Sequence, residues 1–161
     1  MSDPDLTIAR ERPDQPDVLA LLAALDDYLA TLYRPEDNHI LGPAALLAPD
    51  VEFLAARERG VLVGAGALRR MPGEPATGGR PYVEIKRMVV DPAARGRRIG
   101  AQLLAALEEI ARRDGFDLAL LETGALQSAA IRLYERCGYA PRGPFGRYPD
   151  TGASRFFARA L

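Results

Sequence analysis

Three arginines and two glycines lie within six residues of one another, directly before a predicted helix, and this arrangement is suited to binding phosphate. The residues are Arg95, Gly96, Arg97, Arg98 and Gly100. A helix N-terminus presents unpaired N–H groups and a partial positive charge, and glycines let the backbone approach a ligand closely. The pattern favours a small molecule that carries a di- or polyphosphate. A solvated basic turn, in which the glycines serve helix packing, is the alternative interpretation.

Charged side chains also interrupt a strand that should be mostly apolar. Residues 82–90 are predicted to form a central strand, yet they contain Glu84, Lys86 and Arg87. The alternation of side chains along a strand places Arg87 on the face opposite Glu84. Lys86 and Arg87 are candidate ligands for a substrate carboxylate. The alternative is a solvated strand end in which Glu84 pairs with Lys86 on the same face.

Two loops supply further candidate contacts for a substrate. The polar loop 33–39 contains Asn38 and the only histidine, His39, a residue type that more often caps or lies on the surface than catalyses. Residues 143–148 place Phe145 and Tyr148 next to glycines, and an exposed aromatic pair in such a loop suits a position over a ligand. A plain turn before the last strand is the other interpretation of this second loop.

Composition and charge argue against several classes of protein. The chain has 161 residues, 48% hydrophobic and 27% charged, which fits one globular domain over residues 1–161. A formal net charge of −1 argues against a nucleic-acid partner bound through bulk charge. Cys137 is the only cysteine, so no internal disulfide is possible, and one cysteine with one histidine gives no support for a metal site.

No targeting or membrane segment is expected. The stretch MSDPDLTIAR has no basic region followed by an apolar run, so no signal peptide is predicted. The most apolar stretch, VLALLAALDDYLATL, carries Asp26 and Asp27 and is a poor membrane span. A cytoplasmic protein with no membrane partner is the expectation.

The periodicity of apolar side chains predicts the elements that position these residues. The expected helices are 16–33, 43–48, 97–114 and 127–137, and the expected strands are 5–10, 51–58, 61–69, 82–90, 117–122 and 154–161, with a hairpin turn at 59–60 and room for one short strand at 139–142. Asp14 is the expected N-cap of the first helix. In the helix 97–114, Glu108 is expected to pair with Arg112, and Glu109 with Arg113.

Two segments, in this order, resemble motifs of the GNAT superfamily of acyl-CoA-dependent N-acetyltransferases. The first follows the strand end Val-Val-Asp-Pro and places Arg95 and Gly100 at the two ends of the superfamily's Gln/Arg-x-x-Gly-x-Gly/Ala motif. Arg98 stands where a glycine is usual. The second segment, QSAAIRLYERCGY at 127–139, is similar to Asn-x-x-Ala-x-x-Leu-Tyr-Glu-x-x-Gly-Phe, with Gln127 and Tyr139 replacing the asparagine and the phenylalanine.

This resemblance implies a fold and a cosubstrate. The fold is a single α/β (α+β) domain with a mixed, mostly antiparallel sheet of six to seven strands, helices on both faces, and a splay between the two central strands. The cosubstrate is acetyl-CoA, with no metal. The residues implied to hold it are Met88, Val89 and Val90 along the pantetheine arm, residues 95–101 (Arg95, Gly96, Arg97, Arg98, Ile99, Gly100 and Ala101) at the pyrophosphate, and Gln127, Ser128, Ala130 and Tyr134 near the splay.

The resemblance also implies catalytic roles. Tyr134 matches the tyrosine that protonates the departing thiolate, and the alternative for it is a core aromatic on the buried face of its helix. Glu84 matches the strand position where some members keep a general base. The candidate contacts of the acceptor remain Lys86, Arg87, Asn38, His39, Phe145 and Tyr148.

The expected function is N-acetylation of a primary amine of a small molecule, with an amino-acid-like acceptor as a hypothesis from Lys86 and Arg87 beside Glu84. The acetyl group is expected to move by direct attack in a ternary complex. Two other functions stay open: a CoA-binding sensor without turnover, and an N-acetyltransferase of proteins or peptides. A longer acyl donor is also open, and the protein is expected to be a monomer or a homodimer.

Overall fold

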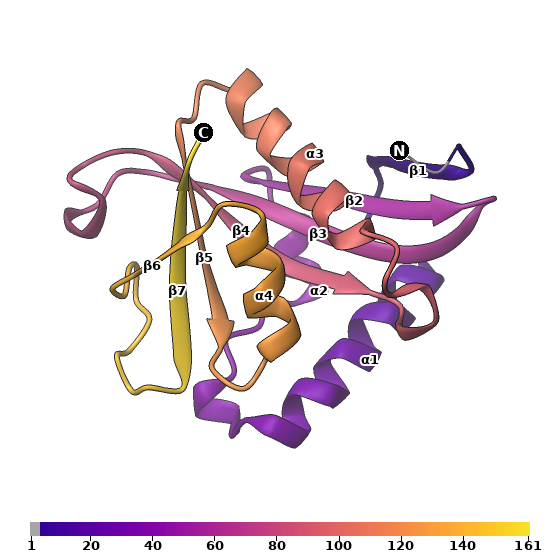
Figure 1. Ribbon diagram of the computed structural model, residues 1–161, viewed down its shortest axis with the longest axis horizontal. Coiled ribbons are helices and arrows are strands. Elements are labelled where there is room, and N and C mark those ends of the chain that lie inside the picture. Colours follow the sequence, from indigo (N-terminus) through magenta and orange to yellow (C-terminus); the bar gives the residue numbers. More distant parts are fainter. Residues whose placement is uncertain (1–3) are drawn as a thin grey trace.

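Seven strands form one sheet in the computed structural model, which describes residues 4–161, so residues 1–3 of the predicted domain lie outside the described residues (Figure 1). The order is β1-β2-β3-β4-β5-β7-β6, and only the β4–β5 pair is parallel. The strands are β1 Leu6–Arg10, β2 Val51–Glu58, β3 Val61–Met71, β4 Tyr82–Val90, β5 Leu118–Gly124, β6 Ala140–Arg142 and β7 Ser154–Ala160. The predicted mixed, mostly antiparallel sheet is confirmed.

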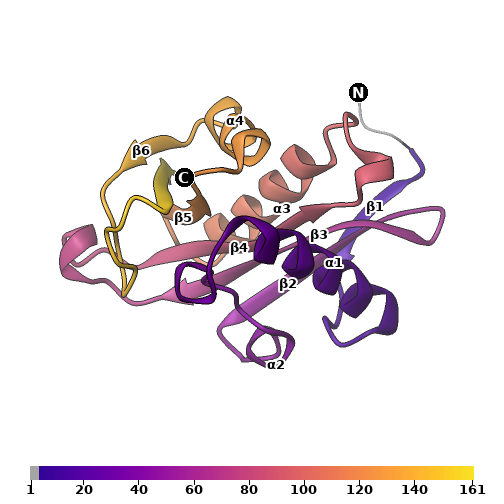
Figure 2. The same cartoon turned by 90° about the horizontal axis from the view of Figure 1, so that it is seen from below.

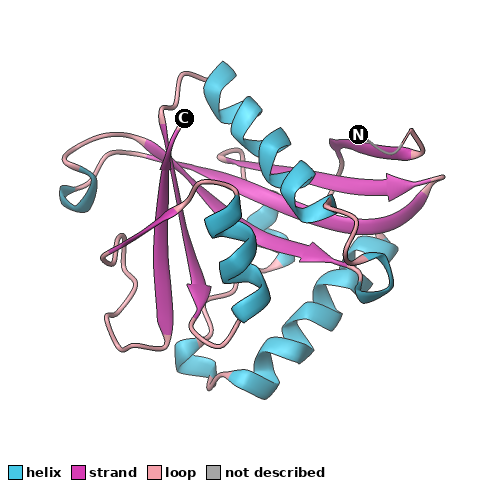
Figure 3. Cartoon of the chain, in the orientation of Figure 1, coloured by secondary structure: helices cyan, strands magenta, loops and turns pink. Residues whose placement is uncertain are grey.

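Helices cover both faces of the sheet, as predicted. They are α1 Pro16–Leu32, α2 Pro43–Leu46, α3 Ile99–Arg113 and α4 Ser128–Arg136, with three short 3₁₀ turns, η1 Pro35–Asp37, η2 Pro75–Thr77 and η3 Pro92–Ala94. Figures 2 and 3 show α3 and α4 on one side of the strands, and Figure 2 shows α1 and α2 on the other. Within residues 4–161, none of the helices has the length and apolar character needed to cross a bilayer.

The two faces of the sheet carry separate hydrophobic clusters. On the α3 side, Leu103, Leu104 and Leu107 are fully buried because they recur at helical spacing along the stripe that faces the strands. On the α1 side, Val18 and Leu22 pack against short side chains of β3 and the aromatic ring of β2. These two clusters hold α3 and α1 against opposite faces of the sheet.

One extra residue in β4 changes which side chains share a face. Arg87 and Met88 both lie opposite Gly66 of β3, and Arg87 has a φ of +58°, so the pair forms a β-bulge. The bulge turns Arg87 towards α1, where its guanidinium donates to Asp26 Oδ1 at 2.5 Å. Glu84 lies on this same face. The prediction that Arg87 and Glu84 point to opposite faces is therefore wrong, because strict alternation ends at the bulge.

A second correction concerns the buried stripe of α3. Glu108 is only 3% exposed and does not pair with Arg112. It accepts hydrogen bonds from Tyr139 Oη at 2.9 Å and from Arg159 Nη1 at 2.7 Å, and burial beside this carboxylate raises the pKa of Tyr139. The expected pair within the helix does not form because Glu108 faces β7 and the end of α4, where these two partners lie. The other expected pair, Glu109 with Arg113, is present at 3.2 Å.

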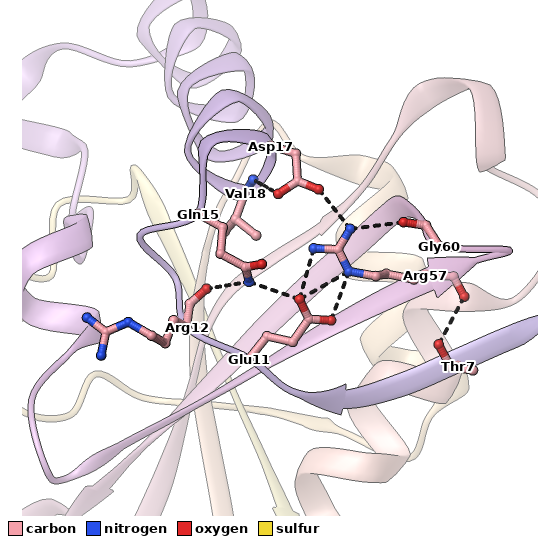
Figure 4. A network of polar contacts seen from close by, with 8 residues as sticks. All are labelled: Thr7, Glu11, Arg12, Gln15, Asp17, Val18, Arg57 and Gly60. Carbon is pink, nitrogen blue, oxygen red and sulfur yellow. Dashed lines mark hydrogen bonds and ion pairs between the residues drawn. The ribbon is translucent and has the colours of Figure 1, made fainter.

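The first helix is anchored by a charged network rather than by the expected cap. Asp14 accepts from Arg12 instead of capping α1, and the N-cap residue is Gln15, whose side chain makes no capping bond. Figure 4 shows Arg57 of β2 reaching both Glu11 and Asp17. Contacts with β2 thus anchor the start of α1, in place of the side-chain cap that the local sequence predicted.

Arg57 binds three acceptors at once. It donates to the carboxylate of Glu11 at 2.9 Å, to Asp17 Oδ2 at 2.7 Å and to the carbonyl of Gly60 at 3.1 Å. The side chains of Arg57 and Glu11 are 18% and 21% exposed, so their charges are well shielded from water. Hydrogen bonds from Arg57 lower the pKa values of both Glu11 and Asp17. The network therefore ties the start of α1 to the sheet.

Replacing Arg57 with methionine is expected to lower the free energy of unfolding by about 1 to 2 kcal/mol at neutral pH. A carboxylate with a lowered folded-state pKa contributes stability above its unfolded pKa and loses it as pH falls through the folded value. The difference in free energy of unfolding between the wild-type protein and Arg57→Met should therefore shrink as the pH falls below the ordinary glutamate pKa of 4.5. Urea unfolding at several pH values measures both effects.

The matched control for this prediction is Arg59→Met. Arg59 lies two residues away and also pairs with a carboxylate, at Asp5, but its side chain is 79% exposed. Its loss should change the free energy of unfolding by less than about 0.5 kcal/mol. Equal effects of the two substitutions would contradict a special role for the Arg57 network.

Candidate active site

The two central strands separate after a short run of pairing. β4 and β5 pair in parallel at Val83, Glu84 and Ile85, and no pairing with β5 is present beyond Ile85. Figure 1 shows the two strands diverging from this point. β4 nevertheless continues to Val90, so within residues 4–161 its last residues have no strand partner on the β5 side. The predicted splay is confirmed, and it leaves backbone groups available to a strand-like ligand.

A cavity of about 90 Å³ lies at this splay, between α1, β4, β5 and α4. It is lined by side chains from both faces of the sheet. Seven of the predicted site residues line it: Asn38, His39, Lys86, Arg87, Met88, Gln127 and Tyr134. Among residues 4–161, no group of three or more histidine, cysteine, aspartate or glutamate side chains is placed to hold a metal ion.

The other predicted site residues lie outside the lining of this cavity. They are Glu84, Val89, Val90, Arg95, Gly96, Arg97, Arg98, Ile99, Gly100, Ala101, Ser128, Ala130, Phe145 and Tyr148. Residues 95–101 form the turn into α3 and its first residues, while Ser128 and Ala130 lie in the first turn of α4. Ser128 and Ala130 therefore lie on the helix that also brings Tyr134 to the cavity, whereas residues 95–101 belong to an element that does not line it.

The turn into α3 contains two residues in the left-handed backbone conformation. Gly96 has a φ of +83°, and Arg98, which stands at the position of a usual glycine, has a φ of +62°. Arg98 is also the N-cap residue and makes no side-chain capping bond, so the first N–H groups of α3 have no side-chain cap there. Arg95 and Arg98 are exposed, and Arg97 pairs with Glu58. The turn thus combines uncapped N–H groups with nearby positive charge.

Glu84 is not part of a solvated strand end. It is 5% exposed, and Tyr148 Oη donates a short hydrogen bond to its carboxylate. Lys86 Nζ donates to the same Tyr148 hydroxyl at 2.7 Å and lies 3.7 Å from Glu84 Oε2. The phenol therefore bridges the two charged groups. Its burial, and next the carboxylate of Glu84 beside it, raise the pKa of Tyr148.

The loop at 143–148 is packed rather than open. Phe145 is 2% exposed, and its ring lies 5.8 Å from Tyr82 and 5.3 Å from Tyr148, so the expected exposed aromatic pair is not present. Glu74 holds the loop by accepting from the N–H of Gly146 at 2.7 Å. The burial of these rings against the sheet explains the difference, because the apolar surface of β5 and β7 is available to them.

Tyr134 presents a protonated hydroxyl at the cavity. It comes from the buried face of α4, is 7% exposed, and its ring packs edge-on against Tyr139 at 6.0 Å. Burial raises the pKa of its phenol, so the proton stays on oxygen at neutral pH. Among residues 4–161 this hydroxyl has no hydrogen-bond partner. Tyr134 is thus both a core aromatic and a possible proton donor to a ligand in the cavity.

Sequence reasoning missed Glu122, which lines the cavity from β5. Ser154 Oγ donates to Glu122 Oε2 at 2.6 Å, and the second carboxylate oxygen has no partner among the described residues. Burial raises the pKa of Glu122 despite the Ser154 hydrogen bond, which lowers it. The signal was present in the sequence as a charged residue after the apolar run LALL, at the end of a strand.

Tyr33 is a second residue that sequence reasoning missed. Its hydroxyl accepts the N–H of Leu126 at 3.0 Å, which joins the end of α1 to the loop after β5. A Cβ on Gly124 would lie 1.9 Å from this hydroxyl, so only glycine leaves room for the ring. Tyr33 therefore closes one end of the cavity.

The sequence matches the acetyltransferase (GNAT) family over residues 17–139. Among curated relatives, the "IAA acetyltransferase" of Azospirillum brasilense is 46% identical over 158 residues, covering 98% of this chain and 99% of the relative. The "Aminoalkylphosphonate N-acetyltransferase" of Salmonella typhimurium is 38% identical over 96 residues, covering 60% of this chain and 61% of the relative.

The fold is also found among solved structures. The crystal structure of a Klebsiella pneumoniae protein that is described as an acyl-CoA N-acyltransferase aligns with a TM-score of 0.79 and 37% identity, covering 97% of each chain. The family match covers the splayed strands, the turn into α3 and α4. Sequence, fold and site therefore agree, and the chain belongs to the GNAT family of acetyltransferases.

Proposed function

We propose that the protein transfers an acetyl group from acetyl-CoA to a primary amine of a small molecule, by direct attack within a ternary complex. The observation that carries the proposal is that Glu122 and Tyr134 line the same cavity at the splay. Transfer to an amine needs a proton acceptor for the amine and a proton donor for the departing sulfur. Both groups are present: burial keeps Tyr134 protonated, and Glu122 can accept a proton above its raised pKa.

The residues around the cavity fit an elongated donor that carries a pyrophosphate. The turn at 95–101 offers uncapped N–H groups and arginines to the phosphates. The unpaired edge of β4 at Met88, Val89 and Val90 offers backbone groups to a pantetheine arm in the place of a missing strand. Gln127, at the start of α4, lines the cavity where the arm would reach the thioester.

The proton transfers can be assigned to side chains. Glu122 takes a proton from the acceptor ammonium, and the neutral nitrogen attacks the thioester carbonyl carbon. The carbonyl re-forms as the carbon–sulfur bond breaks, and Tyr134 donates its proton to the sulfur. The nitrogen releases its remaining extra proton to become a neutral amide, and this proton restores the phenol of Tyr134. Glu84 matches the base position of some relatives, but its carboxylate is engaged by Tyr148 and does not line the cavity. The geometry therefore favours Glu122 over Glu84 as the base.

A small acceptor is supported by the size of the cavity and by the name of one relative. The cavity holds about 90 Å³, and Tyr33 closes one end of it. One relative is named for an aminoalkylphosphonate, which is a small molecule with an amine. A protein or peptide acceptor would need an open groove for several residues.

The turn into α3 is expected to dominate affinity for the donor. Replacing Arg95 with alanine and Arg98 with glycine removes two charges while keeping a residue that accepts the left-handed conformation at 98. Calorimetric titration with acetyl-CoA should show affinity reduced on the order of 10-fold or more at low salt, with a smaller difference at high salt.

The control is the pair Arg112→Ala and Arg113→Ala, at the opposite end of the same helix. It removes the same charge and should leave the affinity for acetyl-CoA unchanged. Equal losses in the two double variants would mean that net charge, rather than the turn, attracts the donor. No binding of acetyl-CoA by the wild-type protein would overturn the proposed function, whereas tight binding without turnover on any amine would support a sensor.

Glu122→Gln is expected to lower kcat by a factor on the order of 10² to 10⁴, since a base within reach of the amine is lost. The base works when deprotonated, and burial raises its pKa above 4.5. The wild-type rate should therefore fall as pH falls through this raised pKa, and the Gln variant should lose that acidic limb. Steady-state rates of CoA release against pH measure both.

Tyr134→Phe should lower kcat in the same assay without changing the affinity for acetyl-CoA, because the ring and its packing are kept. Glu109→Gln, on the exposed face of α3, is the control and should behave as wild type. Loss of the acidic limb in Glu84→Gln, with the limb kept in Glu122→Gln, would return the role of base to Glu84.

A further inference from the structure

Lys86 is the single lysine among the 21 lysine and arginine residues of the chain, and it lies at the cavity. Its side chain is 12% exposed. An ammonium has three N–H donors, and one of them binds the hydroxyl of Tyr148 at 2.7 Å. Glu84 Oε2, at 3.7 Å, is beyond hydrogen-bond distance. The other two donors have no partner among residues 4–161, so a largely buried cation is only partly satisfied.

Glu122 lies across the splay from Lys86. The parallel pairing of β4 with β5 ends at Ile85 and Leu121, and one further step along each strand would set Lys86 opposite Glu122. The strands diverge at this step, and no ion pair joins the two side chains. Each of them lines the cavity, and each has hydrogen-bonding capacity left: two N–H donors of Lys86 and one carboxylate oxygen of Glu122 have no hydrogen-bond partner among residues 4–161. A partly buried cation and a partly buried carboxylate thus line the same small cavity without forming an ion pair.

Arg87 does not compete for the same ligand. Its guanidinium donates to Asp26 Oδ1 at 2.5 Å and to the carbonyl of Leu22 at 3.3 Å, and its side chain is 3% exposed. Asp26 therefore balances its charge, and α1 binds both terminal nitrogens of the guanidinium. Arg87 Nε has no hydrogen-bond partner, but this atom is buried and the side chain is only 3% exposed. Of the two basic residues of β4 that line the cavity, Lys86 is therefore the more accessible donor for a ligand.

We infer that the acceptor is a zwitterion of the α-amino-acid type, with its ammonium at Glu122 and its carboxylate at Lys86. The inference rests on the proposed function, because it names the substrate of the same cavity. Lys86 has Glu84 beside it at 3.7 Å, but two of its N–H donors and one oxygen of Glu122 lack hydrogen-bond partners among residues 4–161. Leaving such groups unsatisfied when water is displaced is costly, whereas a substrate with a neighbouring ammonium and carboxylate would satisfy both. An amine without the carboxylate would leave Lys86 unsatisfied once water is displaced, so it should bind more weakly.

The test compares matched acceptors that differ only in the acid group. Three sets are used: alanine, alaninamide and ethylamine; leucine, leucinamide and isoamylamine; phenylalanine, phenylalaninamide and phenethylamine. CoA release is measured with saturating acetyl-CoA at a pH where each amine is protonated to a similar degree. In at least one set, kcat/KM for the amino acid should exceed the values for its amide and its amine by a factor of 10 or more.

Variants of Lys86 locate the carboxylate. Lys86→Met keeps the length of the side chain and removes its charge, so it should raise KM for the amino acid by a factor of 10 or more with little change in kcat. The same substitution should leave KM for the amide nearly unchanged. Lys86→Arg should restore part of the loss. Arg113→Met, at the exposed end of α3, is the matched control and should behave as wild type.

The outcomes separate this inference from the proposed function. Turnover of amides and plain amines as fast as amino acids, or equal effects of Lys86→Met on acids and amides, overturns the inference and leaves the acetyltransferase standing. If no acceptor is turned over, the proposed function fails. Calorimetric titration of alanine, leucine and phenylalanine against their amides, with CoA present, then decides the inference: selective binding of the acids that Lys86→Met abolishes supports it, and equal or absent binding overturns it.

Discussion

The departure of β4 from β5 after Ile85 is the constraint on which the rest of the site depends. Two parallel strands that stay paired would satisfy each other's backbone groups and leave no space between them. Their separation exposes the edge of β4 and opens a cavity that side chains from both faces can reach. The bulge at Arg87 lies just beyond the last paired residue and turns the side chain of Arg87 towards α1. The strand edge proposed to bind acetyl-CoA and the cavity proposed to bind the amine therefore both result from the separation of β4 and β5.

Arg87 and Glu108 are buried and hydrogen-bonded to side chains of opposite charge, whereas Lys86 and Glu122 at the cavity are not. Arg87 is paired with Asp26, and Glu108 with Arg159, so these charges hold helices and strands together. Lys86 and Glu122 form their hydrogen bonds with neutral hydroxyl groups, and the carboxylate nearest to Lys86, that of Glu84, is 3.7 Å away. Charged groups that keep free hydrogen-bonding capacity are suited to binding a ligand, and this contrast separates the proposed site from the structural pairs.

Local patterns predicted the elements and failed where long-range contacts compete with them. The apolar spacing of α3 and the turn at Arg59-Gly60 depend on neighbours in the sequence, and both are confirmed. The cap at Asp14 and the partner of Glu108 were predicted from local pairing, and both are wrong because partners distant in the sequence occupy those places. The alternation across β4 failed at Arg87, since nothing in the sequence marks the bulge.

The sequence by itself determined the family, the mixed sheet and the turn at 95–101, because these depend on periodicity and on residue types at fixed spacing. Only the tertiary structure decided which charged groups share the cavity. Glu84 was the expected base, and it is bound by Tyr148, which follows it by 64 residues. Glu122 was not singled out, and it lies at the cavity with Lys86. The reason is that burial and pairing of a charge are set by segments far apart in the chain, which no local pattern encodes.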